Sequence, residues 1–314
     1  MTDERVARNW TAFLLIGLVL YGLLYLASEQ LVYRYGHRNR FYMVSTAKSA
    51  RYDYVILGAS HAAVFDYDDM NSRLEKLVGG TVMNLSVVGG GITVNQLLLD
   101  YFLARHRAST VLYVADSFAF YSRQWNEDRL NDTRLFLRAP FDPALARLLL
   151  ANASSRSAGL SYLAGFAKIN NPARFEPDVS EDEASRFSKT YRPVRQIDTE
   201  RIAYLYPASI DSGDRRRYFA QLDSLLQEAR TGGIGVVVVK PPIPERVYRM
   251  LPDEAGFDRD LQTLVARHGV QLYDFSLRCN EDKFFFDTDH LNRNGVMNFY
   301  DNCLKEALPS ARGN

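Results

Sequence analysis

Apolar residues recur along this chain of 314 residues in two alternating patterns. Short runs rich in β-branched residues, typical of strands buried on both faces, occur at 52–57, 82–85, 110–114, 234–239 and 271–273. Between them, apolar positions repeat with a period near 3.6, which predicts helices at 70–77, 94–106, 215–230, 258–268 and 295–308. Strands that alternate with helices favour an α/β fold, a mostly parallel sheet with helices on both faces.

The longest apolar run lies near the N-terminus. Residues 10–27 carry no charge, and their length approaches the ~20 residues that span the hydrocarbon core as a helix. A cleaved signal peptide is the alternative, but the run is long for one, and Tyr25 interrupts the small-residue pattern expected before a cleavage site after Ala27. We therefore expect an uncleaved single-pass anchor at residues 10–32, after a short tail at residues 1–9.

The remainder divides into a juxtamembrane linker, residues 33–50, and an α/β domain, residues 51–314. Within that domain, residues 118–212 break the alternation with polar, aromatic and proline-containing sequence. We expect a helical insertion there, over one end of the sheet. A lid or substrate-docking surface and a decorative subdomain are equally compatible with this pattern.

Composition narrows the class of function. Lys and Arg number 38 against 37 Asp and Glu, so no global positive field exists to hold nucleic acid. Two cysteines are too few for a disulfide framework and lack metal-ligand spacing. We expect Cys303 to be a small buried residue of a helix, and a Cys279–Cys303 disulfide is the less favoured alternative.

The first candidate catalytic residue follows the first predicted strand. Gly58-Ala59-Ser60 follows it directly and places a hydroxyl at the carboxyl edge of the sheet, where open α/β sheets bind ligands. The Ser60 N–H, at a helix start, would face an anion that forms beside the hydroxyl. After the second strand, Asn84 leads to Gly89, Gly90 and Gly91, where a backbone N–H can approach a ligand closely.

The C-terminal region supplies a matching base. Asp287 and His290 are spaced so that the carboxylate can hold one imidazole nitrogen while the other reaches Ser60. Asp289 is the rival carboxylate, but its position next to His290 suggests that it points away, in a cap or turn role. Asn294 is the expected N-cap of the last helix.

These segments resemble the SGNH (GDSL-like) hydrolase superfamily. Its blocks correspond to Gly58–Ser60, to the segment from Asn84 to Gly89, and to the closing Asp-x-x-His. The resemblance implies a flavodoxin-like, three-layer parallel-sheet domain. It also implies Ser60 as nucleophile, His290 as base and Asp287 as its orienting acid, with the N–H groups of Ser60 and Gly89 as oxyanion donors. No cofactor and no metal are expected.

Two departures from the superfamily pattern matter. Ala59 replaces the usual Asp of the first block, which leaves the chemistry intact. The third block, after the third strand, reads Ala-Asp-Ser-Phe from Ala115 and has no Asn, so Ser117 is the alternative oxyanion donor. Loss of such a donor costs ~10²–10³ in rate, which suggests a slow, specialised or partner-dependent protein. The remaining candidates for substrate contact are His61, Asn84, Gly90 and Asn292.

The N-terminal span and the closing motif resemble the membrane-anchored branch of the superfamily. It includes DltD-like proteins of teichoic-acid D-alanylation and proteins of alginate and other exopolysaccharide O-acetylation. This resemblance implies acyl transfer, of D-alanyl or acetyl type, to a cell-envelope glycan or glycolipid, together with a membrane-bound O-acyltransferase. An acyl-carrier is another implied partner.

Orientation in the membrane rests on conflicting signals. Arg34, Arg38 and Arg40 follow the span and outnumber Arg5 and Arg8 before it, which by positive-inside counting leaves the domain in the cytoplasm. Long domains translocate largely regardless of charge, and envelope glycans lie outside. We therefore expect an inner-membrane protein with its domain on the periplasmic side.

Two alternatives to acyl transfer stay open. An esterase or thioesterase that removes acyl groups from a glycan or carrier would use the same triad. A catalytically weak scaffold for the acylation machinery would explain the missing Asn, and Arg215, Arg216 and Arg217 could then contact an anionic polymer, although a solvated helix start is the simpler interpretation of that run.

Overall fold

The computed structural model describes residues 2–170, 176 and 179–308. The chain forms two compact units. The first comprises Met1–Thr46 and Asn131–Glu176, and the second comprises Ala47–Leu130 and Pro177–Asn314. The insertion expected at 118–212 therefore contributes residues to both units.

The second unit contains a parallel sheet of five strands in the order β2-β1-β3-β4-β5. This is the flavodoxin-like order, and the expected α/β class is confirmed. The strands are β1 (Arg51–Leu57), β2 (Val82–Asn84), β3 (Arg107–Val114), β4 (Gly235–Lys240) and β5 (Gln271–Asp274). All five coincide with predicted strands to within three residues. In β1, β3 and β4 the reason is a buried run with β-branched residues, which leaves little choice of structure.

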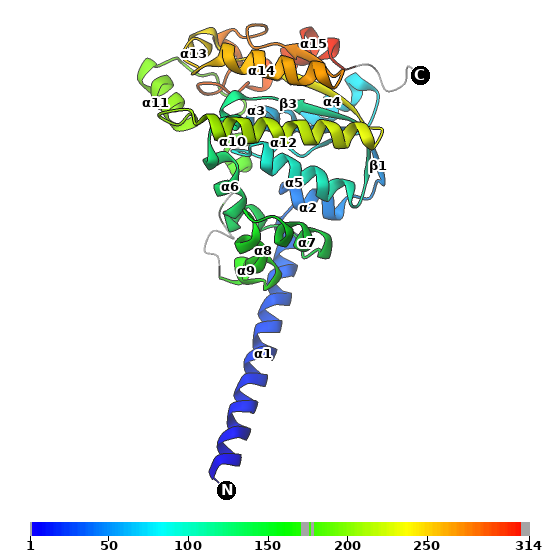
Figure 1. The fold of residues 1–314 in the computed structure, drawn as a ribbon, viewed down its shortest axis with the longest axis vertical. Helices are drawn as coiled ribbons and strands as arrows, with labels where there is room; N and C mark the ends of the chain where they lie inside the picture. Colours follow the sequence, from blue (N-terminus) through cyan, green and yellow to red (C-terminus); the bar gives the residue numbers. More distant parts are fainter. Residues whose placement is uncertain (1, 171–175, 177–178, 309–314) are drawn as a thin grey trace. The chain divides into compact units, whose positions relative to one another are not determined.

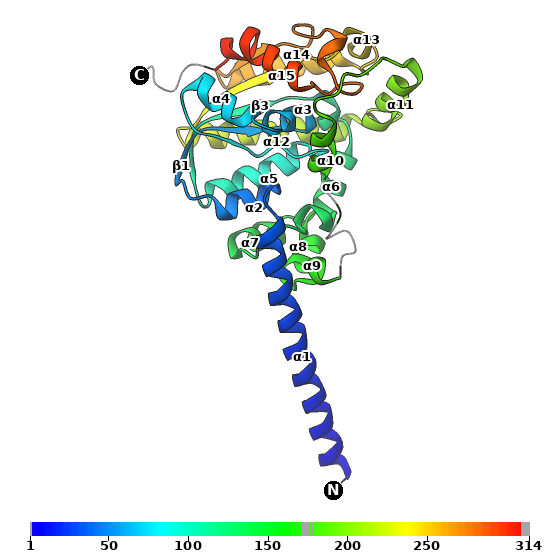
Figure 2. The ribbon, with the colours of Figure 1, turned by 180° about the vertical axis from the view of Figure 1, so that it is seen from behind.

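Helices cover both faces of this sheet (Figures 1 and 2). On one side, α12 packs against α5 and β4, and on the other α15 packs against α4. The helices of this unit are α3 (Ser60–Ala63), α4 (Met70–Val78), α5 (Ile92–Leu103), α6 (Glu127–Asn131), α10 (Val179–Arg186), α11 (Arg195–Leu205), α12 (Ser212–Thr231), α13 (Glu245–Tyr248), α14 (Glu254–Arg267) and α15 (Arg293–Asn302).

The start of α15 corrects one prediction. The side chain of Asn292, not of Asn294, caps the helix, because its Oδ1 accepts a hydrogen bond from the Gly295 N–H at 2.9 Å. The same side chain donates to the carbonyls of Lys283 and Phe285. Asn292 therefore holds the loop before α15 in place as well as the helix start.

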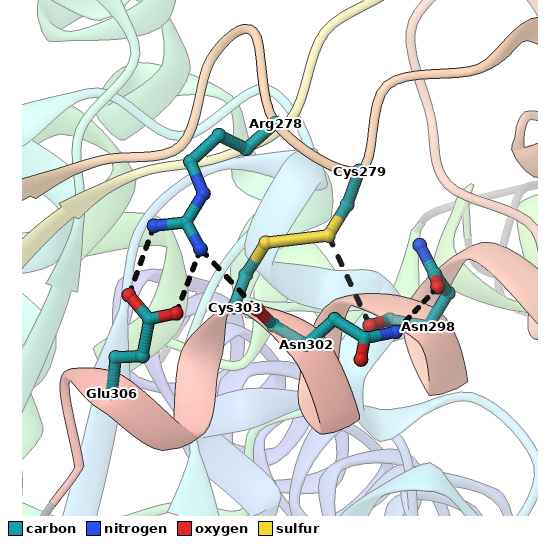
Figure 3. The surroundings of a disulfide bond; sticks show 6 residues. All are labelled: Arg278, Cys279, Asn298, Asn302, Cys303 and Glu306. Atoms are coloured by element: carbon teal, nitrogen blue, oxygen red, sulfur yellow. Dashed lines mark hydrogen bonds and ion pairs between the residues drawn. A yellow bond between two sulfur atoms is a disulfide. The ribbon is translucent and has the colours of Figure 1, made fainter.

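The two cysteines are also joined, contrary to our expectation for Cys303. A disulfide links Cys279, in the loop after β5, to the buried Cys303 at the end of α15 (Figure 3). Beside it, Arg278 makes an ion pair with Glu306 at 2.7 Å. The sequence does not show that this loop crosses the end of α15, so the pairing could not be inferred from spacing.

The first unit is helical. It contains α1 (Thr2–Tyr35), α2 (Arg40–Thr46), α7 (Pro143–Ala151), α8 (Arg156–Leu163) and α9 (Phe166–Ile169). The segment Arg5–Tyr35 of α1 is long and apolar enough to cross a membrane. An N-terminal signal sequence can have the same length and composition. Most large apolar side chains between Trp10 and Leu26 are more than half exposed.

Candidate active site

The end of β1 turns sharply to present Ser60. Gly58 has φ +152°, and a side chain on it would come within 3.0 Å of Val114, so the turn requires glycine. The Gly58 N–H donates to Oδ1 of Asn95 at 3.1 Å, which fixes the turn from α5. Ser60 is the first residue of α3 and is buried, and a first-turn N–H has no acceptor within its own helix.

The loop after β2 forms a second tight turn. Gly89 has φ +67° and lies against the ring of Trp125, and Gly90 donates its N–H to the Val87 carbonyl at 2.8 Å. Gly90 is packed so closely on Val87 that a side chain would clash with it. The turn is consistent with a backbone donor at Gly89, and that role stays a prediction.

Asp287 and His290 form the hydrogen-bonded pair that their spacing suggested. The imidazole Nδ1 lies 3.0 and 2.9 Å from the two carboxylate oxygens of Asp287, which also accepts the His290 backbone N–H. The ring of His290 stacks on Phe286 at 5.5 Å. An Nδ1–H donor leaves Nε2 with its lone pair, which is the tautomer of a general base.

No hydrogen bond joins His290 to Ser60 among the described residues. The polar group near Nε2 is instead the guanidinium of Arg201, from α11, at 3.4 Å. Ser60 and His290 are linked indirectly, because the ring of His61, the residue after Ser60, lies 5.0 Å from the ring of His290. The structure thus brings the three predicted catalytic residues into one region without closing the triad.

Asp289 does not point away as we expected. It is 1% exposed, and both of its carboxylate oxygens accept from Nε of Arg201, at 3.1 and 3.0 Å. It also lies 3.5 Å from His61 Nε2 and from His290 Nδ1. The expectation failed because Asp287 accepts the Asp289 N–H, which forms a tight turn, and the side chain of Asp289 is directed to the interior.

His61 belongs to a second buried His–Asp pair. Its Nδ1 lies 2.6 Å from Oδ1 of Asp116, the carboxylate in the third block. Burial opposes protonation of this ring, but the charges of Asp116 and Asp289 outweigh burial and raise the pKa of His61 to about 10. At neutral pH, His61 is therefore an imidazolium held between two carboxylates, which favours a structural and electrostatic role over substrate contact.

The charges around His290 oppose one another. Burial favours its neutral form, but Asp287 and Asp289 outweigh burial and raise its pKa. Burial also opposes ionisation of Asp289, yet Arg201 and His290 hold the pKa of that carboxyl well below its usual range. The pKa of Asp287 is lowered by His290 against a similar burial effect. Two carboxylates thus favour the protonated base, while the adjacent Arg201 favours the neutral one.

A polar cluster lies beside this network. Ser117, our alternative oxyanion donor, donates its hydroxyl to Glu254 and lies 2.6 Å from the Tyr206 hydroxyl. Lys240, the last residue of β4, has its Nζ 2.8 Å from a carboxylate oxygen of Glu254. These groups line a pocket of about 10 Å³ together with His61, room for about one water molecule. The Ser117 hydroxyl is therefore committed to Glu254 rather than to the Ser60 region.

Asn84 makes internal contacts that account for its polar groups. Its amide donates to the Ala62 carbonyl at 2.8 Å and its oxygen accepts from Ser86. It is fully buried, as Asn292 nearly is. Asn84, Asn292 and Gly90 therefore support their own loops, and their contact with substrate stays a prediction.

His61, Asp289 and His290 offer donor atoms within 4.8 Å of one another, as a metal site would. The neighbouring charge does not fit a divalent cation, because Arg201 already binds both oxygens of Asp289 and lies beside His290 Nε2. A metal ion would have to displace this guanidinium or accept its repulsion. The cluster is better explained as an ion-paired network.

No protein-family model and no curated protein matches the chain. Among solved structures, it is similar to an acylhydrolase candidate from Bacteroides fragilis, with 10% sequence identity over 83% of this chain and 88% of the other, and a TM-score of 0.41. A likeness at this level says nothing about activity.

Proposed function

We propose that this protein is a serine-dependent acyltransferase or esterase. The observation that carries the proposal is the contact between His290, which is hydrogen-bonded to Asp287, and His61, the residue that follows Ser60 at the carboxyl end of β1. A hydroxyl at this edge of a parallel sheet, near an oriented imidazole, has the parts that acyl transfer requires.

In the proposed reaction, the Ser60 hydroxyl attacks the acyl carbonyl and its proton passes to His290 Nε2. Asp287 keeps Nδ1 protonated and stabilises the imidazolium that forms. The N–H groups of Ser60 and Gly89 bind the developing oxyanion. His290 then returns the proton to the leaving group, and a sugar hydroxyl or water, deprotonated by His290, attacks the acyl-enzyme to release the product and regenerate Ser60.

Arg201 explains why activity would depend on substrate or partner. Its guanidinium lies 3.4 Å from the Nε2 that must accept the Ser60 proton. Because guanidinium groups only donate, Arg201 and the Ser60 hydroxyl compete for the same lone pair. In our proposal, binding of the acyl donor or of a membrane partner moves Arg201 toward Asp289 and lets Ser60 replace it.

For the substrate, we propose a cell-envelope glycan, a glycolipid or a carrier-bound acyl group, with a membrane-bound O-acyltransferase as partner. Two features support an envelope location. Helix α1 has the length and hydropathy of a membrane anchor, and the Cys279–Cys303 disulfide suits an oxidising compartment such as the periplasm. The resemblance of the N-terminal span and of the closing Asp287–His290 motif to the membrane-anchored branch adds the acceptor class.

The decisive experiment is intact-mass analysis of the full-length protein in detergent after treatment with a fluorophosphonate and, separately, with p-nitrophenyl acetate. We expect one adduct, lost in Ser60→Ala and retained in Ser276→Ala, a matched change of another buried serine. Labelling that persists in Ser60→Ala would end the serine hypothesis. A folded wild-type protein that does not label, even with a co-expressed O-acyltransferase, would favour a binding scaffold.

A further inference from the structure

The turn between α8 and α9 packs on α1 within its apolar stretch. The hydroxyl of Tyr21 donates to the Ala164 carbonyl at 2.7 Å, and the ring of Tyr25 lies against Gly165, which has φ +74°. Figures 1 and 2 both show α8 and α9 alongside α1. Both tyrosines belong to the uncharged run 10–27. The α8–α9 turn therefore lies beside the part of α1 that would be inside a membrane.

The surface of this turn is apolar. Leu160, Leu163 and Phe166 are 57%, 45% and 54% exposed. Between residues 157 and 169 the single charged side chain is Lys168, which is 2% exposed and makes an ion pair with Glu29 of α1. A soluble surface of this size would normally carry exposed charges, and large apolar patches mark sites of interaction.

The depth of the turn can be placed along α1. Tyr21 precedes Ala27, the last residue of the uncharged run, by six positions, which corresponds to about 9 Å along a helix. Interfacial helices bury their apolar faces ~5–10 Å into the boundary between lipid headgroups and acyl chains. The buried pair of Lys168 and Glu29 lies just beyond the run, so its charges need not enter the hydrocarbon.

We propose that the α8–α9 turn is a second membrane-contacting element, which inserts Leu160, Leu163 and Phe166 into the lipid interface beside α1. Lipid is the occupant that the structure favours, because the exposed face of the turn is continuous with the exposed apolar surface of α1. The first unit would then be fixed to the membrane by two elements. Cleavage after Ala27 would remove Tyr21 and Tyr25, so the contact also argues for a retained anchor.

The test uses full-length protein in phospholipid nanodiscs, kept oxidised so that Cys279 and Cys303 stay paired. Single cysteines replace Leu160, Leu163 or Phe166, and each is labelled with the environment-sensitive dye NBD. Gln227→Cys on α12, an exposed polar position, is the control. Intact mass confirms that α1 is present, and thermal unfolding confirms that each variant folds.

We expect labels at 160, 163 and 166 to emit at shorter wavelength than the control, and to be quenched at least about threefold less by aqueous iodide. Lipids spin-labelled at acyl carbon 5 should quench them more strongly than lipids labelled at carbon 12, since the depth is interfacial. Equal iodide quenching at all positions would refute lipid contact. Labels shielded from iodide but insensitive to spin-labelled lipid would show that protein covers the turn, which also overturns the proposal. An intact mass showing that the protein purified from membranes lacks residues 1–27 would also overturn the proposal.

Discussion

The guanidinium of Arg201 donates from Nε to both carboxylate oxygens of Asp289, at 3.1 and 3.0 Å, and its Nη2 lies 3.4 Å from His290 Nε2. One side chain from α11 therefore connects the rival carboxylate to the proposed base. This relationship separates the roles of the two aspartates in the closing motif, since Asp287 contacts Nδ1 of the base while Asp289 neutralises Arg201.

We expect Asp287→Asn and Asp289→Asn to fail in different ways. Asp287→Asn removes the acceptor that fixes the His290 tautomer and should lower kcat by about 10³–10⁴, with little loss of stability because its side chain is 27% exposed. Asp289→Asn leaves Arg201 partly buried without its carboxylate and should destabilise by about 3–5 kcal/mol. Esterase kinetics and urea unfolding of both variants separate the two effects. If Asp289→Asn instead lost activity and Asp287→Asn lost stability, Asp289 would be the orienting acid.

Arg201→Met should move the pH profile of acylation. The groups facing His290 are Asp287, Asp289, Arg201, His61 and Glu183. Removal of a cation from this set leaves the carboxylates less opposed, so the pKa of His290 rises further. His290 must be neutral to accept the Ser60 proton, and the ascending limb of kcat/KM should therefore shift to higher pH. Fluorophosphonate labelling rates between pH 6 and 10 measure the shift, and Arg201→Lys, which retains the charge, should shift less.

His61 gives a stability prediction with a defined sign. Its pKa is about 10 in the fold, against about 6.5 for an unperturbed histidine. A raised pKa means that its stabilising contribution is complete below pH 6.5 and is lost as the pH rises toward 10. The free energy of unfolding should accordingly fall between pH 7 and 10 in the wild type. His61→Gln should be less stable at pH 7 and show a flatter decline. An equally steep decline in the variant would mean that other groups titrate.

The sheet and the carboxyl ends of its strands could be predicted from the sequence. Buried β-branched runs define β1, β3 and β4, and Gly58-Ala59-Ser60 follows β1 as expected, because both signals are local. Asp116 could also have been found, since it is a carboxylate just beyond a strand end. Arg201 could not, because α11 lies in an insertion with no periodic signal, 88 residues before Asp289. Side-chain partners between distant segments depend on packing that no local pattern records.

The disulfide should stabilise the fold without taking part in the chemistry. The two cysteines are 24 residues apart in sequence, and the entropy that a crosslink of this span removes from the unfolded chain corresponds to about 3.5 kcal/mol of stability. Because it joins the loop after β5 to the end of α15, it constrains both ends of the segment that carries Asp287 and His290. Cys279→Ala with Cys303→Ala should therefore lower the urea midpoint while Ser60 labelling at 25 °C stays within about twofold of wild type.

Arg278→Gln is the matched control, since it removes only the exposed ion pair with Glu306 and should cost under about 1 kcal/mol. Equal stabilities of the double variant and the control would show that the cysteines are not bonded in solution, and would remove the disulfide as support for an oxidising compartment.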